Sequence, residues 1–150
     1  MSVLLALDPG GRTGWSLWRF DAITPITHLE HGTVEGGLDG FIAWWKVEGW
    51  QPDVVVSETF VLDGRTPKPD ITPLKIEGAL SVLFPGWVGQ RNVMKRHAPD
   101  AFLKEHGLWW PGKGHDRDSA RHAIAWAKTN LHRPTLDAYW GRRRGLEIAA

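Results

Sequence analysis

The stretch VLLALDPGGRTGW, residues 3–15, places a short apolar run directly before an aspartate and a Pro-Gly-Gly turn. An apolar run closed by proline and glycine predicts a buried strand that ends in a tight turn. Asp8 would be the last residue of that strand, in the middle of a sheet. A buried carboxylate needs a cation or hydrogen-bond donors. Asp8 is therefore either part of a metal site or a turn residue that accepts hydrogen bonds from backbone N–H groups.

The composition limits the kind of site that the chain can build. Its 150 residues suit a single domain, residues 1–150, with a substantial core. The chain has no cysteine, which excludes disulfides, thiolate zinc sites and a cysteine nucleophile. A metal site would have to consist of Asp, Glu and His. No apolar run approaches the ~20 residues of a membrane helix, and the N-terminus lacks a secretory pattern, so we expect a cytoplasmic protein with no membrane partner.

The net charge of +1 conceals an uneven distribution. Residues 1–90 hold six basic and eleven acidic side chains, whereas residues 91–150 hold twelve and six. The basic excess includes a C-terminal tail, about residues 131–150, with three consecutive arginines at 142–144. Such asymmetry indicates either a polyanion facing the C-terminal part or simply a solvated helical surface.

The first half of the chain predicts a meander followed by a crossover. Residues 13–20 and 26–34 predict two more strands, antiparallel to the first. The spacing of apolar residues from Leu38 to Trp45 predicts an amphipathic helix that ends near Gly49. The β-branched run at residues 53–57 then predicts a buried strand parallel to the first. Because parallel strands bring their carboxyl ends to one edge, Glu58 is expected beside Asp8, unless it is an edge carboxylate paired with Arg or Lys.

The second half predicts mainly helices. Thr72 and Pro73 suit the N-cap and first position of a helix that follows a polar loop. Further along the chain we expect a short strand at 87–93, a short helix at 99–106, a loop at 108–114 and a long helix at 115–130. That loop fits the start of a phosphate-binding loop, but Gly114 stands where Ser or Thr would be needed and no strand leads into it, so we expect no nucleotide cofactor.

The helix at 115–130 carries the remaining polar candidates. His115, Asp118 and His122 lie on one face, and the first two, three residues apart, could reach one metal. Asp118 could instead be an acid that complements the helix N-terminal dipole. Asp116 is a candidate N-cap. We interpret His122 as structural or close to DNA rather than as a ligand.

The four candidate residues together indicate which metal ion the site would bind. Asp8, Glu58 and Asp118 offer hard oxygen ligands and His115 adds one imidazole, a set that suits Mg²⁺ or Mn²⁺. Two such ions ~4 Å apart support phosphodiester hydrolysis without a serine or cysteine nucleophile.

Three motifs in order carry a resemblance to a known family. They are Asp8-Pro9-Gly10 with Thr13-Gly14-Trp15, the apolar strand ending at Glu58 with Phe60 beyond it, and His115-x-x-Asp118-Ser119-Ala120 before an Ala-rich helix. Over about residues 3–128 the sequence resembles the RuvC-type Holliday-junction resolvases of the ribonuclease H-like superfamily, and most of all compact phage-encoded members. A bacterial or phage-infected cytoplasm would be its location.

The resemblance implies a fold, partners and roles. The fold would be an α/β, ribonuclease H-like mixed five-stranded sheet, an antiparallel meander plus parallel strands, flanked by helices. The protein would be a homodimer that nicks branched DNA with two Mg²⁺ or Mn²⁺ ions. Asp8, Glu58 and Asp118 would be ligands and His115 a ligand or proton-transfer group, while Lys75 would approach the scissile phosphate. The candidate nucleic-acid contacts are Lys75, Arg91, Lys95, Arg96, Lys113, Arg117 and Arg121.

Other functions fit the same sequence. The segment between the second and third motifs is shorter than the family's, so flaps or other branches are also candidate substrates. The chain could instead be a non-catalytic module that binds branched DNA, which would not require the carboxylates to converge. A small RNA-processing nuclease of the same superfamily is a further alternative. An actin-like sugar kinase, which shares a similar first turn, needs a far longer chain.

Overall fold

Five strands form one mixed sheet in the order β3-β2-β1-β4-β5. The computed structural model describes the backbone of residues 1–149 and the side-chain surroundings of residues 1–141. The strands are β1 (Ser2–Asp8), β2 (Arg12–Phe20), β3 (Thr27–Glu35), β4 (Val54–Glu58) and β5 (Val88–Gln90). β1 pairs antiparallel with β2, and β2 pairs antiparallel with β3. β4 runs parallel to β1, and β5 runs parallel to β4. The expected meander and crossover are confirmed.

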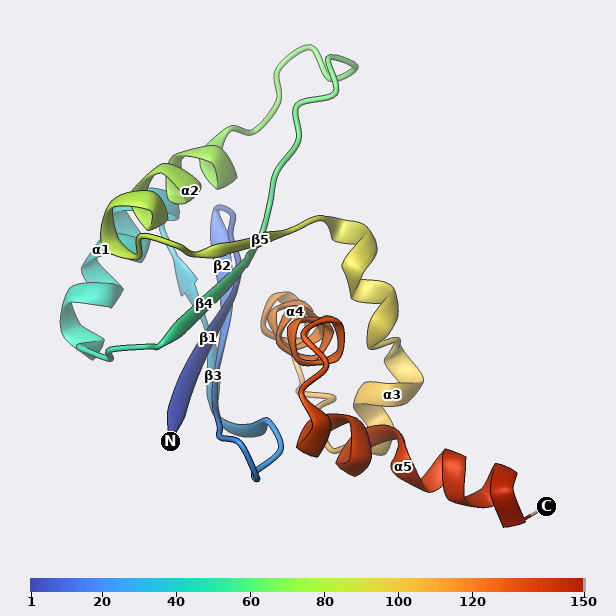
Figure 1. Ribbon diagram of the computed structural model, residues 1–150. Coiled ribbons are helices and arrows are strands. Elements are labelled where there is room, and N and C mark those ends of the chain that lie inside the picture. The colour runs from blue at the N-terminus through green and yellow to red at the C-terminus, as the bar shows by residue number, and fades with distance from the viewer. Residues whose placement is uncertain (150) are drawn as a thin grey trace.

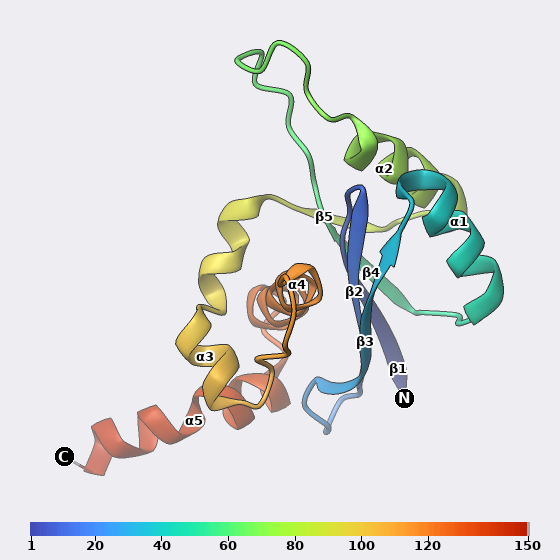
Figure 2. The same ribbon diagram turned by 180° about the vertical axis from the view of Figure 1, so that it is seen from behind.

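Helices cover both faces of this sheet (Figures 1 and 2). The helices are α1 (Gly37–Glu48), α2 (Thr72–Leu83), the 3-10 helix η1 (Asn92–His97), α3 (Asp100–Glu105), α4 (His115–Thr129) and α5 (Arg133–Ala149). α1 and α2 lie on one face, while α4 packs on the other with α3 and α5 outside it. No helix in the described part of the chain is both long and apolar enough to cross a membrane.

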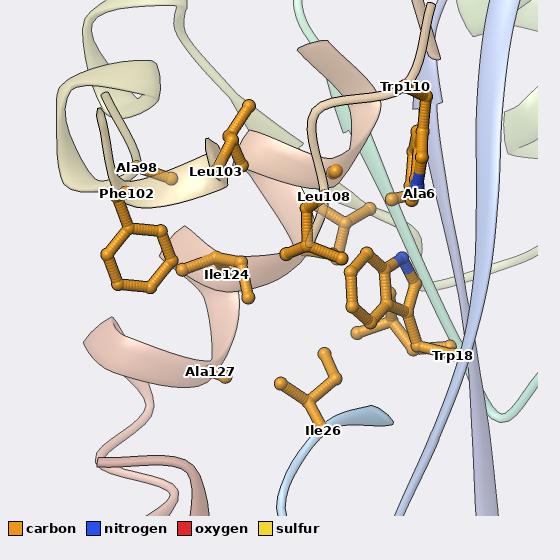
Figure 3. Close-up of a cluster of buried hydrophobic side chains, with 14 residues drawn as sticks. Ala6, Trp18, Ile26, Ala98, Phe102, Leu103, Leu108, Trp110, Ile124 and Ala127 are labelled. Carbon is orange, nitrogen blue, oxygen red and sulfur yellow. The ribbon is translucent and has the colours of Figure 1, made fainter. Parts of the chain in front are cut away.

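Strict alternation along the central strands divides the core into two layers. Leu4 and Ala6 of β1 face α4, whereas Leu5 and Leu7 face α1 and α2. This is the period-two pattern of a strand that is covered on both sides. Figure 3 shows the α4 side, where Trp18 of β2 packs among aliphatic side chains of α3, α4 and the loop before α4.

Small side chains let α4 approach the sheet closely. Ala120, Ala123, Ile124 and Ala127 of α4 are completely buried. Since alanine adds only one carbon beyond the backbone, the helix axis can lie near the strands.

Two predicted elements differ from the structure. The strand expected at 87–93 covers only β5, because the chain turns into η1 after Arg91, whose carbonyl accepts a hydrogen bond from the Met94 N–H at 3.0 Å. The segment expected as a basic tail forms α5, which is anchored where the Tyr139 hydroxyl donates to the Ile26 carbonyl at 2.9 Å. The side chains of the three arginines at 142–144 lie outside the described residues.

Both predicted N-caps are wrong. α2 begins with Thr72, so Pro73 is its second residue, and the Thr72 N–H donates to the Asp70 carboxylate at 2.9 Å. α4 begins after Gly114, whose φ of 97° is left-handed. Asp116 is therefore already inside the helix.

Candidate active site

The alternation of the strands directs three polar side chains toward α4. Asp8 continues the Leu4–Ala6 face of β1, and Glu58 continues the Val54–Val56 face of β4. Gln90 is the register partner of Glu58 on β5. The carboxyl ends of three parallel neighbours thus place Asp8, Glu58 and Gln90 side by side, as predicted for the first two.

The α4-facing side chains of β2 become smaller toward this edge. Trp18 is followed by Ser16 and then by Gly14, the register partner of Asp8. Trp18 Nε1 donates to Ser16 Oγ at 2.8 Å, and Ser16 Oγ accepts from Ser119 Oγ of α4 at 2.8 Å. A Cβ on Gly14 would lie 2.0 Å from the carbonyl carbon of His115, so only glycine fits. The decrease in side-chain size along β2 allows the first turn of α4 to pack against the sheet beside Asp8.

That first turn delivers the two predicted α4 residues. His115 Nδ1 lies 3.7 Å from Asp8 Oδ2. Asp118 reaches the same edge, where the ammonium of Lys95 lies 3.3 Å from Asp118 Oδ2 and 3.2 Å from Glu58 Oε1. The four predicted ligands therefore lie at one edge of the sheet, and Lys95 of η1 places a positive charge between Glu58 and Asp118.

Burial makes this cluster electrostatically unusual. Burial raises the pKa of Asp8 to about 9, and its hydrogen bond to Glu58 and the negative charge of Glu58 add to the shift. Burial also acts to raise the pKa of Glu58, but the hydrogen bond from Asp8 and the charge of Lys95 outweigh it and lower that pKa. Asp8 consequently carries the proton that the two carboxyls share near neutral pH.

Lys95 offsets part of the negative charge of this cluster. Burial opposes its charged form, yet the nearby Asp8, Glu58 and Asp118 raise the pKa of Lys95 above its ordinary value. Sequence reasoning gave more weight to Lys75 than to Lys95. Lys75 is exposed near the start of α2, and among the described residues it forms no hydrogen bond or ion pair with these carboxylates. The signal for Lys95 was weak because a 3-10 helix has no apolar periodicity to reveal which side chain points inward.

Arg117 and Arg121, like Lys95, are predicted DNA contacts that are engaged within the protein. Arg121 binds Asp118 Oδ1 at 3.1 Å, the Ala98 carbonyl at 2.7 Å and Asp100 at 2.6 Å. It therefore holds Asp118 in position. The Arg117 guanidinium donates to the Trp110 carbonyl and lies 4.2 Å from the centre of the Trp109 ring. By contrast, the side chains that remain exposed near the site are Lys75, Arg91, Arg96 and Lys113.

Asp116 anchors the outer side of α4. Its carboxylate is buried and lies 2.9 Å from Nδ1 of His31 on β3. The His31 ring stacks on Trp110 with centroids 3.9 Å apart. Asp116 was predicted as a cap because it lies in the first turn, but its role is to join α4 to the edge strand.

Gln90 and His122 are buried next to Glu58, and sequence reasoning assigned neither of them to the site. His122 is completely buried, and its Nδ1 lies 2.8 Å from Gln90 Oε1. Its Nε2 lies 4.0 Å from Glu58 Oε1. Burial lowers the pKa of His122 to about 4, so the ring is neutral at neutral pH. Nothing in the local sequence marks Gln90, because its place depends on pairing with β4.

The donor set fits a divalent cation in its chemistry. Three carboxylates and an imidazole meet where the protein already places an ammonium, which stands in for a positive ion. Among the residues that the structure describes, no group of three acidic or histidine side chains has metal-binding spacing as it stands. A cation would therefore bind by taking the place of the Lys95 ammonium.

A cleft opens beside Glu58. It has a volume of about 470 Å³ and runs between the loop after β4 and the start of η1. The Phe60 N–H donates to Glu77 of α2 at 2.8 Å, which fixes the start of that loop. The lining residues are Pro9, Glu58, Thr59, Phe60, Val61, Pro73, Arg91, Asn92 and Val93. The cleft thus connects the carboxylates with an exposed arginine.

The fold of the chain is similar to that of solved structures. RuvC of Thermus thermophilus in complex with a Holliday junction is similar at a TM-score of 0.65 and 14% identity, covering 88% of this chain and 97% of that one. A second T. thermophilus RuvC structure has a TM-score of 0.61 and 16% identity, over 94% and 96% of the two chains. The Fowlpox virus resolvase bound to junction DNA has a TM-score of 0.55 and 12% identity, over 84% and 99%. No protein-family model and no curated protein sequence matches the chain significantly. The chain has the ribonuclease H-like fold of these resolvases.

Proposed function

We propose that this chain is a structure-selective endonuclease that cuts four-way and other branched DNA by metal-dependent phosphodiester hydrolysis. One observation carries the proposal: Asp8, Glu58 and Asp118 come from distant parts of the sequence and meet around one positive charge. Polypeptides seldom bury several carboxylates together without a function, because their mutual repulsion and desolvation are costly. The fold that surrounds them is that of RuvC and the poxvirus resolvase, each solved with a Holliday junction.

Each residue then has a distinct task. Asp8, Glu58 and Asp118 would hold Mg²⁺ or Mn²⁺, as two ions in the full site, and the ions would polarise the scissile phosphate and stabilise the charge that develops there. Arg121 keeps Asp118 aimed at the site. His115, with 39% of its side chain exposed, lies at the rim and can bind an ion or move a proton. Lys95, once displaced from Glu58 and Asp118, is placed to contact a phosphate oxygen.

DNA would enter along the cleft beside Glu58. Arg91 lines it, and Lys75, Arg96 and Lys113 are the other exposed basic candidates. Paired nicks across a four-way junction require two active sites, so we propose that a homodimer is the working form.

The first test is cleavage of a labelled four-way junction by wild type and by Asp118→Asn, with Mg²⁺, Mn²⁺ or a chelator. We expect paired, metal-dependent nicks that Asp118→Asn loses. Asp137→Asn is the matched control, because it makes the same change on exposed α5. The same branch in RNA should be cut much less. Junction binding with no nicking of any DNA or RNA branch would overturn the nuclease proposal.

Salt sensitivity tests the DNA-facing residues. If four exposed basic side chains contact phosphates, log K for junction binding should fall against log[salt] with a slope of about −3.6. Titrations by fluorescence anisotropy from low to physiological salt would measure it. Replacing Arg91 with Gln should reduce the slope by about one, and a slope near zero in wild type would remove these residues from the interface.

A non-catalytic DNA-binding module is the second candidate. It is favoured by one feature: Lys95 and Arg121 already neutralise Asp118 and Glu58 without a metal. The junction assay separates the two functions.

A further inference from the structure

Behind the carboxylates, His122 forms a second layer of the site. It lies one helical turn after Asp118 on α4, facing the paired ends of β4 and β5. Gln90 on β5 contacts one ring nitrogen and Glu58 on β4 faces the other. The histidine is thus held between a neutral amide and a carboxylate.

The hydrogen bond with Gln90 determines the tautomer. Gln90 Oε1 can only accept, so His122 Nδ1 carries the hydrogen and donates it at 2.8 Å. With its hydrogen on Nδ1, the neutral imidazole has its lone pair on Nε2. That nitrogen is completely buried and has no hydrogen-bond partner among the residues that the structure describes. An unsatisfied buried acceptor is unfavourable, and a bound ligand would satisfy it.

The group opposite Nε2 indicates which ligand fits. Glu58 Oε1 is also an acceptor and lies 4.0 Å away. Two donor atoms that each bind one ion at about 2.1 Å can lie up to about 4.2 Å apart. A divalent cation between them satisfies both lone pairs with little movement. Lys95 lies 3.2 Å from the same Glu58 oxygen but makes no hydrogen bond to the histidine.

We propose that His122 Nε2 is a nitrogen ligand of the cation that Glu58 binds, with Gln90 as the residue that orients it. This inference rests on the proposed function, since it concerns the same metal. An imidazole ligand on this side, in addition to His115 beside Asp8, makes the site better suited to Mn²⁺ than to Mg²⁺, which prefers oxygen donors.

Pulsed EPR of Mn²⁺ bound to the full chain tests the ligand directly, because a coordinated imidazole modulates the electron spin echo through its ¹⁴N nucleus. We expect His115→Gln to retain this modulation, which then comes from His122. The double variant His115→Gln/His122→Gln should lose it. His132→Gln is the control, since both ring nitrogens of His132 form hydrogen bonds, to the Thr135 hydroxyl and the Asp21 carbonyl.

Affinity supplies a second readout. We expect His122→Gln to weaken Mn²⁺ binding at least about tenfold in calorimetry while changing Mg²⁺ binding less than about twofold. Gln90→Glu should strengthen Mn²⁺ binding, because a carboxylate partner makes the ring a better donor. Loss of ¹⁴N modulation in His115→Gln alone, or no Mn²⁺ binding by wild type, would overturn the inference. That single variant leaves His122 intact, so the result does not depend on whether a His122 variant folds.

The two proposals fail differently. Junction cleavage by wild type without ¹⁴N modulation in His115→Gln would remove His122 from the metal site and leave the nuclease standing. Mn²⁺ bound through His122, with no cleavage of any branch, would support the His122 ligand and overturn the nuclease proposal.

Discussion

Replacing Asp8 with asparagine is expected to lower junction cleavage by about a thousandfold, equivalent to about 4 kcal/mol of transition-state stabilisation. Asparagine keeps the size of the side chain but removes a charge that the cation needs. Single-turnover cleavage with saturating Mn²⁺ would measure the loss. DNA binding, followed by anisotropy, should stay within about twofold, because Asp8 is buried whereas the basic side chains proposed to bind DNA are exposed.

The same substitution should make the metal-free protein more stable. With a folded pKa of about 9 and an ordinary unfolded value, Asp8 must take up a proton when the chain folds between those two pH values. Wild-type stability therefore falls as pH rises through this window, by at most about 1.4 kcal/mol per unit from this group. Asparagine needs no proton. The advantage of Asp8→Asn in urea unfolding should grow from pH 5 to pH 8.

In wild type, Glu58 adds no pH dependence of stability within this window. Its folded pKa is lowered, so the stability that it contributes is already present above its unfolded pKa and is lost only at more acidic pH. Asp137→Asn is again the control, and its effect should be independent of pH over the same range. Equal pH dependence of wild type and Asp8→Asn would show that Asp8 is ionised in the folded protein.

Replacing Gly14 with alanine is expected to destabilise the fold by at least about 3 kcal/mol. Its new methyl group would lie 2.0 Å from the His115 carbonyl carbon and 2.5 Å from the Asp116 nitrogen, both rigid backbone atoms at the start of α4. The helix would have to move away from β2. Urea unfolding measures the loss of stability, and the Mn²⁺ affinity of the folded fraction should fall as well.

Gly11→Ala is the matched control for this substitution. Gly11 lies in the same β1–β2 hairpin, and a Cβ there would meet nothing within 4 Å. Its unfolding midpoint should stay close to that of wild type. If both alanine variants lose the same stability, the cause is glycine in the hairpin rather than the approach of α4.

Most of the sheet and three of the carboxylates could be predicted because local patterns determine them. The apolar runs that end at Asp8 and Glu58 identify buried strands, and parallel pairing brings those ends together. Asp118 was found from its spacing to His115 on a strongly periodic helix. In each case the signal lies within a few residues of the side chain that it concerns.

The remaining parts of the site depend on contacts between distant segments. Lys95 comes from a 3-10 helix without periodicity, and Gln90 from a strand of three residues. His122 was interpreted as structural or close to DNA, because nothing in the local sequence shows that Gln90 and Glu58 flank its ring. Asp116 and Thr72 were assigned to caps by their position in the sequence. In the structure, the Asp116 carboxylate contacts His31 on β3, and the Thr72 N–H donates to the Asp70 carboxylate. Pairing and packing, rather than propensity, place all of these groups.

The long separation of the three carboxylates along the chain has a consequence for synthesis in the cell. During translation the β1–β3 meander can form early, since its contacts are local, but the site waits for α4, which is synthesised after all five strands. A nascent or prematurely terminated chain that lacks Asp118 therefore has no complete set of carboxylates. The order of the elements therefore delays assembly of the proposed site until α4 has been synthesised, when Gly14 allows that helix to dock.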